Sequence, residues 1–504
     1  MVLFKILMRI FNKQLVQMSE SVNKLASVKQ SSGYHMHENN ARRLSLRTLV
    51  IFALFGVALI SFSACTPQTK SVSVPVDTTR AFSEGGNAVV SDRWWDAFEN
   101  ERLSKLVDSA LSTNFGLQNT WQRLRAAQAV VERESSSFFP TLDASAGGEL
   151  SQYQTEFVQN QQLRLGLSSS YEVDLWGRIR SRVEASRYRA RATRADYQTA
   201  ALSLAAEVSR TWFQLSEAQR QLEVVRAQVA TNEKVLSLLK ARFGRGQIRS
   251  VDILRQQQLL EATREQETAA EARLQSLKHQ LAVLLGQPPQ QEVEVSTDSL
   301  PGLPALPETG LPTQLVRRRP DIRSAFNRLQ AADREVAAAI SNRYPRLSIT
   351  ASASTAADNA NQLFQDWARS VAGNLLAPLF YGGQLQAEVD RTQAVKQQRL
   401  YEYGQTVLTA FREVENALMR EKKQKETIQS IRRQLSLARQ AYEQLRLEYF
   451  NGMSGYLDVL TALEEMQQLR RDLLTAQRRL LEYRVSLYRS LAGGVEMEDA
   501  PGEQ

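Results

Sequence analysis

The sequence has very few cysteines and histidines, and this scarcity excludes several classes of function. Among 504 residues there are one cysteine, Cys65, and three histidines. A single thiol cannot form an internal disulfide or a cysteine-rich zinc site. Because histidine is the commonest general base, imidazole-based catalysis has almost nothing to work with. The sequence also contains no nucleophile motif, phosphate-binding loop or metal-ligand spacing, so we expect no catalytic residue, cofactor or metal.

An export signal is expected at the amino terminus. A basic stretch precedes an uncharged run, residues 48–64, that is rich in Leu, Ile, Val, Phe and Ala. This arrangement is typical of a secretory signal. Met36 would start a signal of ordinary length, so the start codon stays open between Met1 and Met36. Residues 1–64 carry eight Lys and Arg against two acidic residues, within a net charge of +9. The rest of the chain is therefore weakly basic, and we expect no nucleic-acid partner.

The only cysteine lies directly after this apolar run. Ser63-Ala64-Cys65 resembles a bacterial lipobox, although Phe62 stands where leucine is usual. The position predicts that Cys65 is lipidated. The alternative is an uncleaved anchor, or an ordinary signal that happens to end at a cysteine.

The rest of the chain contains an internal duplication. Residues 136–142, Ser-Ser-Phe-Phe-Pro-Thr-Leu, recur at 341–347 as Ser-Asn-Arg-Tyr-Pro-Arg-Leu, at an offset of 205 residues. The segment around Trp176 matches the segment around Tyr381 at the same offset. A constant offset over this distance indicates a repeated unit. Each copy is expected to run strand, loop, strand, long helix, turn, long helix.

Long stretches without glycine or proline predict unusually long helices. Residues 178–243 and 247–285 contain neither residue type. The second copy has 384–451, interrupted only by Gly404, and 456–492.

Within the first of these helices the apolar residues follow a coiled-coil period. From Leu204 to Phe243 they alternate steps of four and three, with Asn232 among them. This 3.5-residue period implies a left-handed supercoil against neighbouring helices. We expect each helix to bury a narrow stripe and to expose the rest.

Four segments alternate in the manner of membrane strands. From 163 to 175 the odd positions are nearly all apolar and the even positions are polar or Gly. Residues 142–148 and 347–353 alternate in the same way, and a fourth strand is expected at about 369–381. Such lengths suit a membrane barrel strand. For the strands alone, a water-facing sheet packed on a core is the alternative.

Four strands cannot enclose a useful lumen, and open sheet edges cannot face lipid. We therefore expect the chain to assemble with copies of itself, and three copies would supply 12 strands and 12 long helix tracks. The predicted fold class is an α+β membrane protein. It is a trimeric 12-stranded β-barrel, with four strands from each protomer, continued by a long α-helical coiled-coil barrel. Trp176 and Tyr381 would lie near the edge of the lipid-facing belt.

Several short motifs carry a family resemblance. Arg318-Arg319-Pro320-Asp321 matches a family signature, and Trp94-Trp95 and the turn at 449–460 add to it. With the duplication, these motifs make residues 91–494 resemble the TolC-like outer-membrane efflux channels, in the lipoprotein branch that serves RND-type pumps. Pro320 suits the first turn of a helix and Asp321 suits its dipole, so we expect a structural role for the signature.

The resemblance implies a function and a set of partners. The chain would form a homotrimer in the outer membrane of a Gram-negative bacterium, in contact with outer-membrane lipid and with its helical barrel in the periplasm. It would passively export small molecules from a complex of a periplasmic adaptor (membrane fusion) protein and an inner-membrane RND-type pump. The runner-up is a periplasmic coiled-coil adaptor lipoprotein or a structural scaffold, which should have a single hairpin. An enzyme ranks third.

The turns between the long helices are the candidate functional site. By the resemblance, Leu457 and Asp458 fall at gate positions, and Asp252, the counterpart of Asp458 in the first copy, is a further candidate gate residue. In a trimer Asp458 would form a carboxylate ring that attracts cations, and Leu457 an apolar constriction. Gly246 and Gly452 let the turns tighten and are the expected adaptor contacts. The alternatives are that the aspartates favour helix N-termini and that the glycines simply end helices.

The chain is thus expected to contain ten segments. They are a signal segment (1–64), a lipid-anchored linker (65–90), an N-terminal helical segment (91–135), a first membrane β-hairpin (136–176), a first long helical hairpin (177–285), a linker (286–311), a helical segment (312–341), a second membrane β-hairpin (342–383), a second long helical hairpin (384–492) and a flexible tail (493–504).

Overall fold

The computed structural model describes residues 81–89, 91–152, 159–290, 300–310 and 312–492. The chain divides into two units, residues 1–66 and 67–504, and all described residues belong to the second. The predicted signal segment, Cys65 and the predicted tail lie outside the described residues.

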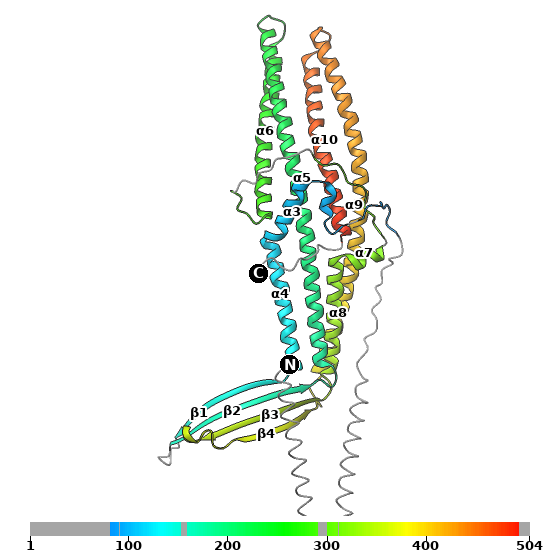
Figure 1. The fold of residues 1–504 in the computed structure, drawn as a ribbon. Helices are drawn as coiled ribbons and strands as arrows, with labels where there is room; N and C mark the ends of the chain where they lie inside the picture. The colour runs from blue at the N-terminus through cyan, green and yellow to red at the C-terminus, as the bar shows by residue number, and fades with distance from the viewer. Residues whose placement is uncertain (1–80, 90, 153–158, 291–299, 311, 493–504) are drawn as a thin grey trace, which may run out of the picture. The chain divides into compact units, whose positions relative to one another are not determined.

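The second half of the structure repeats the element order of the first. The elements of the first half are η2 (Trp94–Phe98), α3 (Glu101–Thr113), α4 (Phe115–Ser135), η3 (Ser136–Phe138), β1 (Thr141–Gln152), β2 (Gln159–Val173), α5 (Arg178–Phe243) and α6 (Ser250–Leu284). Those of the second half are α7 (Pro312–Arg318), α8 (Pro320–Ser341), β3 (Arg346–Ala357), η4 (Ala360–Gln362), β4 (Ala368–Leu376), α9 (Gln384–Phe450) and α10 (Tyr456–Leu491) (Figure 1).

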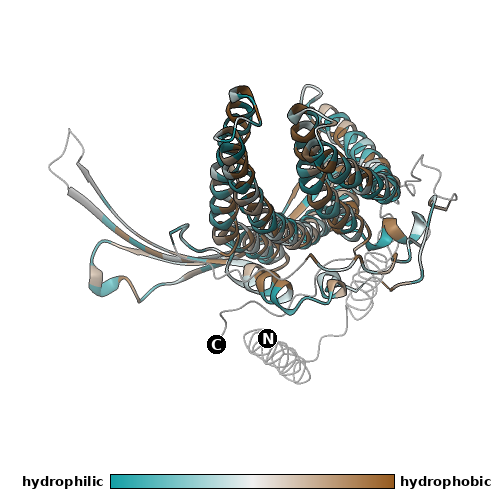
Figure 2. Ribbon diagram, turned by 90° about the horizontal axis from the view of Figure 1, so that it is seen from above, coloured by the Kyte–Doolittle hydropathy of each residue, from teal (hydrophilic) through white to brown (hydrophobic). Residues whose placement is uncertain are grey.

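The four long helices predicted from the sequence are present. α5 and α9 run without a break over 66 and 67 residues, and each forms a hairpin with the helix that follows it. Figure 2 shows the two hairpins end-on, side by side, with hydrophobic and hydrophilic residues alternating around each helix. None of the described helices is both long and apolar enough to cross a membrane.

The coiled-coil stripe of α5 is buried as predicted along most of its length, although Phe243 at its end is 47% exposed. α5 also buries more than this stripe. Val208, Leu215 and Leu222 are between 0% and 4% exposed. The expectation that the other faces are exposed is wrong at Glu217 and Gln228, which are buried. The reason is that α5 contacts α10 as well as α6, so a third helix covers a polar face.

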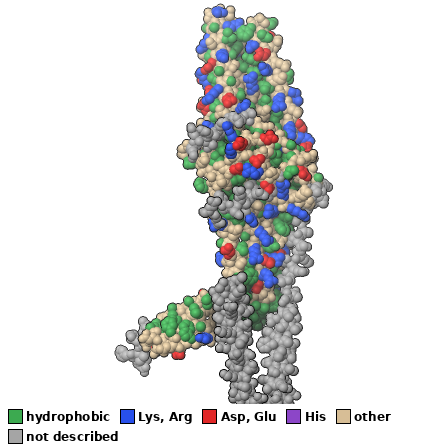
Figure 3. Space-filling view, viewed as in Figure 1, with side chains coloured by type: hydrophobic (Ala, Val, Ile, Leu, Met, Phe, Trp, Pro, Cys, Tyr) green, Lys and Arg blue, Asp and Glu red, His purple; other side chains and the backbone are tan. Residues whose placement is uncertain are grey.

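The strands form one antiparallel sheet in the order β1-β2-β3-β4, and its register confirms the predicted alternation. Leu165 pairs with Ala146 on one side and with Thr355 on the other, so the odd positions of β2 share a face with the even positions of β1. Apolar side chains on this face are open to solvent in the single chain, with Leu142 at 70% and Val371 at 79% exposure. Figure 3 shows hydrophobic side chains gathered on the sheet.

Two strands end earlier than predicted, for local reasons. β2 ends at Val173, because the Asp174 carboxylate turns to cap α5 and accepts the backbone N–H of Ile179 at 3.0 Å. The prediction of a fourth strand to about residue 381 is wrong, since β4 ends at Leu376. Pro378 follows two residues later and has no N–H to donate to a strand ladder.

The largest packed core lies where η2 and α3 meet α5 and α10. Trp94 and Trp95 are fully buried, and Trp94 stacks on Tyr488 of α10 with ring centroids 5.7 Å apart. Phe98 packs on Phe213 of α5 at 5.1 Å. These aromatic contacts fix residues 94–113 on one face of the long helices.

Candidate functional site

The candidate site lies at the turns that end the two helical hairpins. Residues 244–249 join α5 to α6, and residues 451–455 join α9 to α10. Gly246 has φ of +73° and Gly452 has φ of +78°. A Cβ atom at either position would meet no other atom within 4 Å. Backbone conformation, and not lack of space, therefore requires glycine at both turns.

Asp458 combines a capping contact with exposure to solvent. It is the third residue of α10, and its Oδ2 accepts the backbone N–H of Gly455 at 3.2 Å. Its neighbour Leu457 is 48% exposed. The structure thus places an exposed carboxylate and an exposed apolar side chain together at the start of α10. The helix-terminus role and the gate role considered for Asp458 are compatible in this geometry.

Asp252 occupies the equivalent position of α6 but has a different environment. It is only 6% exposed, and its Oδ1 lies 3.9 Å from Nη2 of Arg249. That oxygen has no hydrogen-bond partner among the described residues. Burial raises the pKa of Tyr456 in α10, and the negative charge of Asp252 adds to this shift. The two aspartates are therefore equivalent in sequence but not in exposure.

Aromatic and polar contacts join the tips of the two hairpins. The guanidinium of Arg242, at the end of α5, lies 5.2 Å from the ring centroid of Tyr449 and 5.3 Å from that of Phe450, at the end of α9. The hydroxyl of Tyr456 donates to Oε1 of Gln256 in α6. Sequence reasoning used Tyr449 and Tyr456 only as part of a family motif and missed Arg242, Phe450 and Gln256. Two adjacent aromatics at a helix end, opposite an arginine in the first copy, were a usable signal.

Buried polar side chains continue from the tip along the contact between α5 and α10. Asn232 is fully buried, donates to Thr263 of α6 at 2.9 Å and accepts from Gln467 of α10 at 3.4 Å. Glu217 is also fully buried, with Arg273 of α6 at 3.1 Å and Thr475 of α10 at 3.0 Å. We call this contact the α5–α10 seam; it contains Gln214, Glu217, Gln221, Gln228 and Asn232 of α5 with Gln467, Arg471, Thr475, Arg478 and Glu482 of α10.

The signature motif joins three helices. Pro320 is the first residue of α8, and Arg318 is the last residue of α7. Nη2 of Arg319 lies 2.6 Å from Asp321 and 2.9 Å from Glu413 of α9, while Nη1 donates to a backbone carbonyl of α10 at 3.2 Å. Burial alone would raise the pKa of Asp321, but its contact with Arg319 lowers it overall. These contacts hold the start of α8 against α9 and α10.

Comparison with known proteins identifies relatives along most of the chain. Pyoverdine export outer membrane protein OpmQ of Pseudomonas aeruginosa is 29% identical over 469 residues, which are 87% of this chain and 97% of that protein. Toluene efflux pump outer membrane protein TtgF of Pseudomonas putida is 30% identical over 413 residues, 80% of this chain and 85% of that protein.

The fold is shared with a solved channel. The structure of the outer-membrane channel OprN superposes with a TM-score of 0.76 at 30% identity, covering 85% of this chain and 99% of that one. The family model described as outer membrane efflux protein matches residues 106–287 and 311–493. The chain therefore belongs to the outer membrane efflux protein family.

Proposed function

We propose that three copies of this chain form a passive outer-membrane channel that exports small molecules received from a pump and adaptor complex. The observation that carries the proposal is the four-stranded sheet. One face is mainly apolar, with Arg369 of β4 as a charged exception, and the outer edges of β1 and β4 pair with no other strand in the described part of the chain. An unpaired backbone group costs several kcal/mol in lipid, so such a sheet needs partners before it can face a membrane.

The sheet is suited to closure by identical copies. Its strands alternate in direction, so β1 and β4 run antiparallel to each other. The β1 edge of one copy can therefore pair with the β4 edge of the next in the sense that already holds within the sheet. Three copies close a 12-stranded barrel with the apolar face toward lipid. The repeated order of elements supports an origin by internal duplication.

The long helices would continue this barrel across the periplasm, and their tips would form the gate. Around a threefold axis Asp458 forms a carboxylate ring and Leu457 an apolar constriction, while Asp252 stays inside the contact between hairpins. The contacts of Arg242 and Tyr456 hold the hairpins together at the tip. Opening would move the hairpins apart by exchanging such polar contacts, without breaking backbone hydrogen bonds within a helix.

The proposed protein partners follow from the hairpin tips. The polar hairpin tips, with Gly246 and Gly452 in their turns, would meet the coiled coil of a periplasmic adaptor, which in turn contacts an inner-membrane RND-type pump.

Cys65 would carry a lipid anchor. Intact-mass measurement of the mature protein tests this, and a mass that fits an unmodified cysteine contradicts lipidation. The channel itself would carry out no chemistry. Cargo of the kind named for the relatives, such as a siderophore or toluene, is the expected class.

The channel proposal is tested with full-length protein purified in detergent from outer membranes. In detergent, light scattering should give the mass of three chains. In planar bilayers the same protein should give discrete conductance steps. A matched control carries Val371→Asp on the apolar face of β4, where a buried charge would oppose insertion into lipid. A wild-type protein that is monomeric and silent in bilayers would contradict the proposal.

A further inference from the structure

A cluster of arginines lines a pocket far along the helices from the proposed gate. The pocket has a volume of about 440 Å³ and lies between α5, α9 and α10. We call it the arginine pocket; its lining includes Arg210, Arg412, Arg420 and Arg489, together with Asn416 and Tyr483.

The positive charge of this pocket is poorly balanced. Glu413 is the one acidic side chain that lines it, and Glu413 is already held by Arg319 at 2.9 Å and by Arg489 at 3.7 Å. Arg412 and Arg420 form no ion pair with any described residue. Guanidinium groups stay charged at any physiological pH, so a bound anion would relieve their mutual repulsion.

Arg210 and Arg489 show the effect of this crowding. Burial lowers the pKa of Arg210 and the positive charge of Arg489 lowers it further, while the negative charges of Glu207 and Glu482 only partly oppose this shift. Arg210 has a neutral partner, Oγ of Ser486 at 3.0 Å. The buried Nε of Arg489 has no hydrogen-bond partner among the described residues. The pocket therefore offers an unused donor beside crowded positive charge.

The opposite face of the same helices is covered by other parts of the chain. On α10, Tyr488 stacks on Trp94 and Arg484 donates to the carbonyl of Ala305. On α9, Phe411 contacts the ring of Phe82 at 6.0 Å. At 3.6 residues per turn, Ser486 and Arg489 lie about 160° and about 100° around α10 from Tyr488. Arg420 and Arg412 lie roughly 180° and roughly 100° around α9 from Phe411, so the pocket residues point away from the covered face.

This arrangement sets the direction in which the pocket faces. A conduit needs an open bore, so the covered face must point outward and the arginine pocket must face the bore. We propose that the arginine pocket binds the carboxylate or phosphate group of an anionic solute inside the channel, an inference that rests on the proposed trimeric function. The forked guanidinium donors match such oxyanions. With one pocket in each copy, the bore gains an anion-binding band between the membrane barrel and the carboxylate gate.

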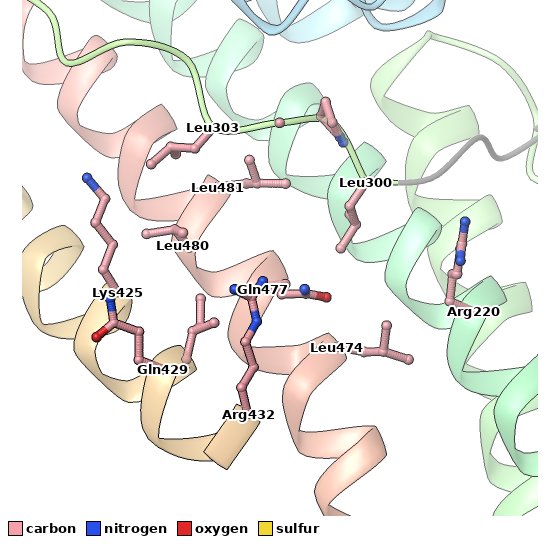
Figure 4. A pocket seen from close by; sticks show the side chains of 13 residues that line it. Arg220, Leu300, Leu303, Lys425, Gln429, Arg432, Leu474, Gln477, Leu480 and Leu481 are labelled. Carbon is pink, nitrogen blue, oxygen red and sulfur yellow. The ribbon is translucent and has the colours of Figure 1, made fainter. Parts of the chain in front are cut away.

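The test variant is Arg412→Gln/Arg420→Gln, because these two arginines hold no ion pair with described residues and their loss should not disturb folding. The matched control is Arg220→Gln/Arg432→Gln. Those two arginines line a different pocket, of about 550 Å³, whose other walls include Leu300 and Leu303 from residues 300–310, the segment whose Ala305 carbonyl accepts from Arg484 on the covered face (Figure 4). The control removes the same charge from the outward face of the same helices.

The measurement uses full-length trimers in planar bilayers, with a KCl gradient for ion preference and with citrate as a probe that blocks the current. The test variant should lower the chloride-to-potassium permeability ratio about two- to fivefold and weaken citrate block at least about tenfold. The control should change neither. Arg412→Lys/Arg420→Lys keeps the charge but not the fork, so it should retain the permeability ratio and lose part of the block.

The outcomes separate this inference from the channel proposal. If wild type conducts and the Gln and control variants behave alike, the arginine pocket is not an anion site. If the Gln variant does not assemble, the Lys variant is compared with wild type instead. Equal citrate block in these two proteins would also show that the arginine pocket is not an anion site. If wild type does not conduct at all, the proposed channel fails and the inference fails with it.

Discussion

The side chain of Arg484 holds three parts of the fold together. It is 1% exposed and pairs with both carboxylate oxygens of Glu421 in α9, at 2.8 and 2.6 Å. It also donates to the backbone carbonyl of Ala305 at 2.6 Å. A single guanidinium thus joins α9, α10 and the segment 300–310. The contribution of Arg484 to stability is best measured by replacing its side chain, because the Glu421 carboxylate would then be buried without its main partner.

Arg484→Met should destabilise the protein by about 3–5 kcal/mol, because the variant leaves Glu421 as a poorly paired buried charge. The measurement is the midpoint of heat or urea unfolding in detergent. Arg226→Met is the matched control, since Arg226 pairs with Glu267 and Glu271 on the exposed surface of the first hairpin. Its unfolding midpoint should stay close to that of wild type. Equal losses in the two variants would contradict this assignment.

The same pair predicts a loss of stability in acid. Burial alone would raise the pKa of Glu421, but Arg484 and Lys425 outweigh it and lower the pKa below the ordinary value of 4.5. The ion pair therefore stabilises the folded state fully above about pH 4.5, and this contribution is lost as the pH falls from there through the lowered pKa. Wild type should lose more stability than Arg484→Met between pH 6 and pH 3; parallel curves would refute the linkage.

The gate assignment is also decided at the residue scale. Leu457→Ala and Asp458→Ala should each raise single-channel conductance, because each removes a side chain from the narrowest part of the proposed tube. Asp458→Asn keeps an oxygen for the Gly455 N–H and removes only the charge, so it should mainly reduce cation preference. Asp252→Asn, at a buried position, is the control and should change conductance less. Unchanged conductance and selectivity in all variants would count against the gate.

At the scale of elements, the α5–α10 seam is the feature that distinguishes this helical assembly from a plain coiled coil. The 3.5-residue period predicted the buried stripe of α5 correctly at Leu215 and Leu222. It could not predict the burial of Glu217 or Gln228, because the period of one helix does not report which further helix packs against its polar face. Asn232 was visible as a polar residue at a core position, a pattern that can fix register.

The seam should control how easily the hairpins separate. Hydrogen bonds between side chains can be exchanged for hydrogen bonds to water, whereas buried apolar surface cannot be exposed without cost. Asn232→Leu/Gln467→Leu would replace the central polar pair by an apolar one, and it should reduce open probability and slow efflux several-fold. Gln434→Leu/Gln440→Leu, at exposed positions of α9, is the control. A seam variant that gates like wild type would show that the seam does not limit opening.

At the scale of the whole molecule, the architecture was readable from the sequence because it depends on periodic patterns. The alternation at 163–175 predicted which residues share a face of the sheet. The long stretches that nearly lack glycine and proline predicted the long helices. The end of β4 was predicted too late, although Pro378 marks it in the sequence. The arginine pocket was not readable, because Arg210, Arg412 and Arg489 come from three helices and meet only in the folded chain.

The central claim is that one chain supplies a third of the barrel and borrows the remaining strands from identical copies. Cross-linking across the open edges tests it most directly. Ser145→Cys on β1 and Ser370→Cys on β4 both lie on the polar face of the sheet, in a chain whose single native cysteine is Cys65. A bismaleimide of about 13 Å spans neighbouring strands with a register tolerance of a few residues.

Native outer membranes treated with this reagent and separated in denaturing gels should show one, two and three linked chains and nothing larger. Each single-cysteine variant should show no such ladder. A double variant that stays a single chain, or a ladder that continues past three, would contradict the account.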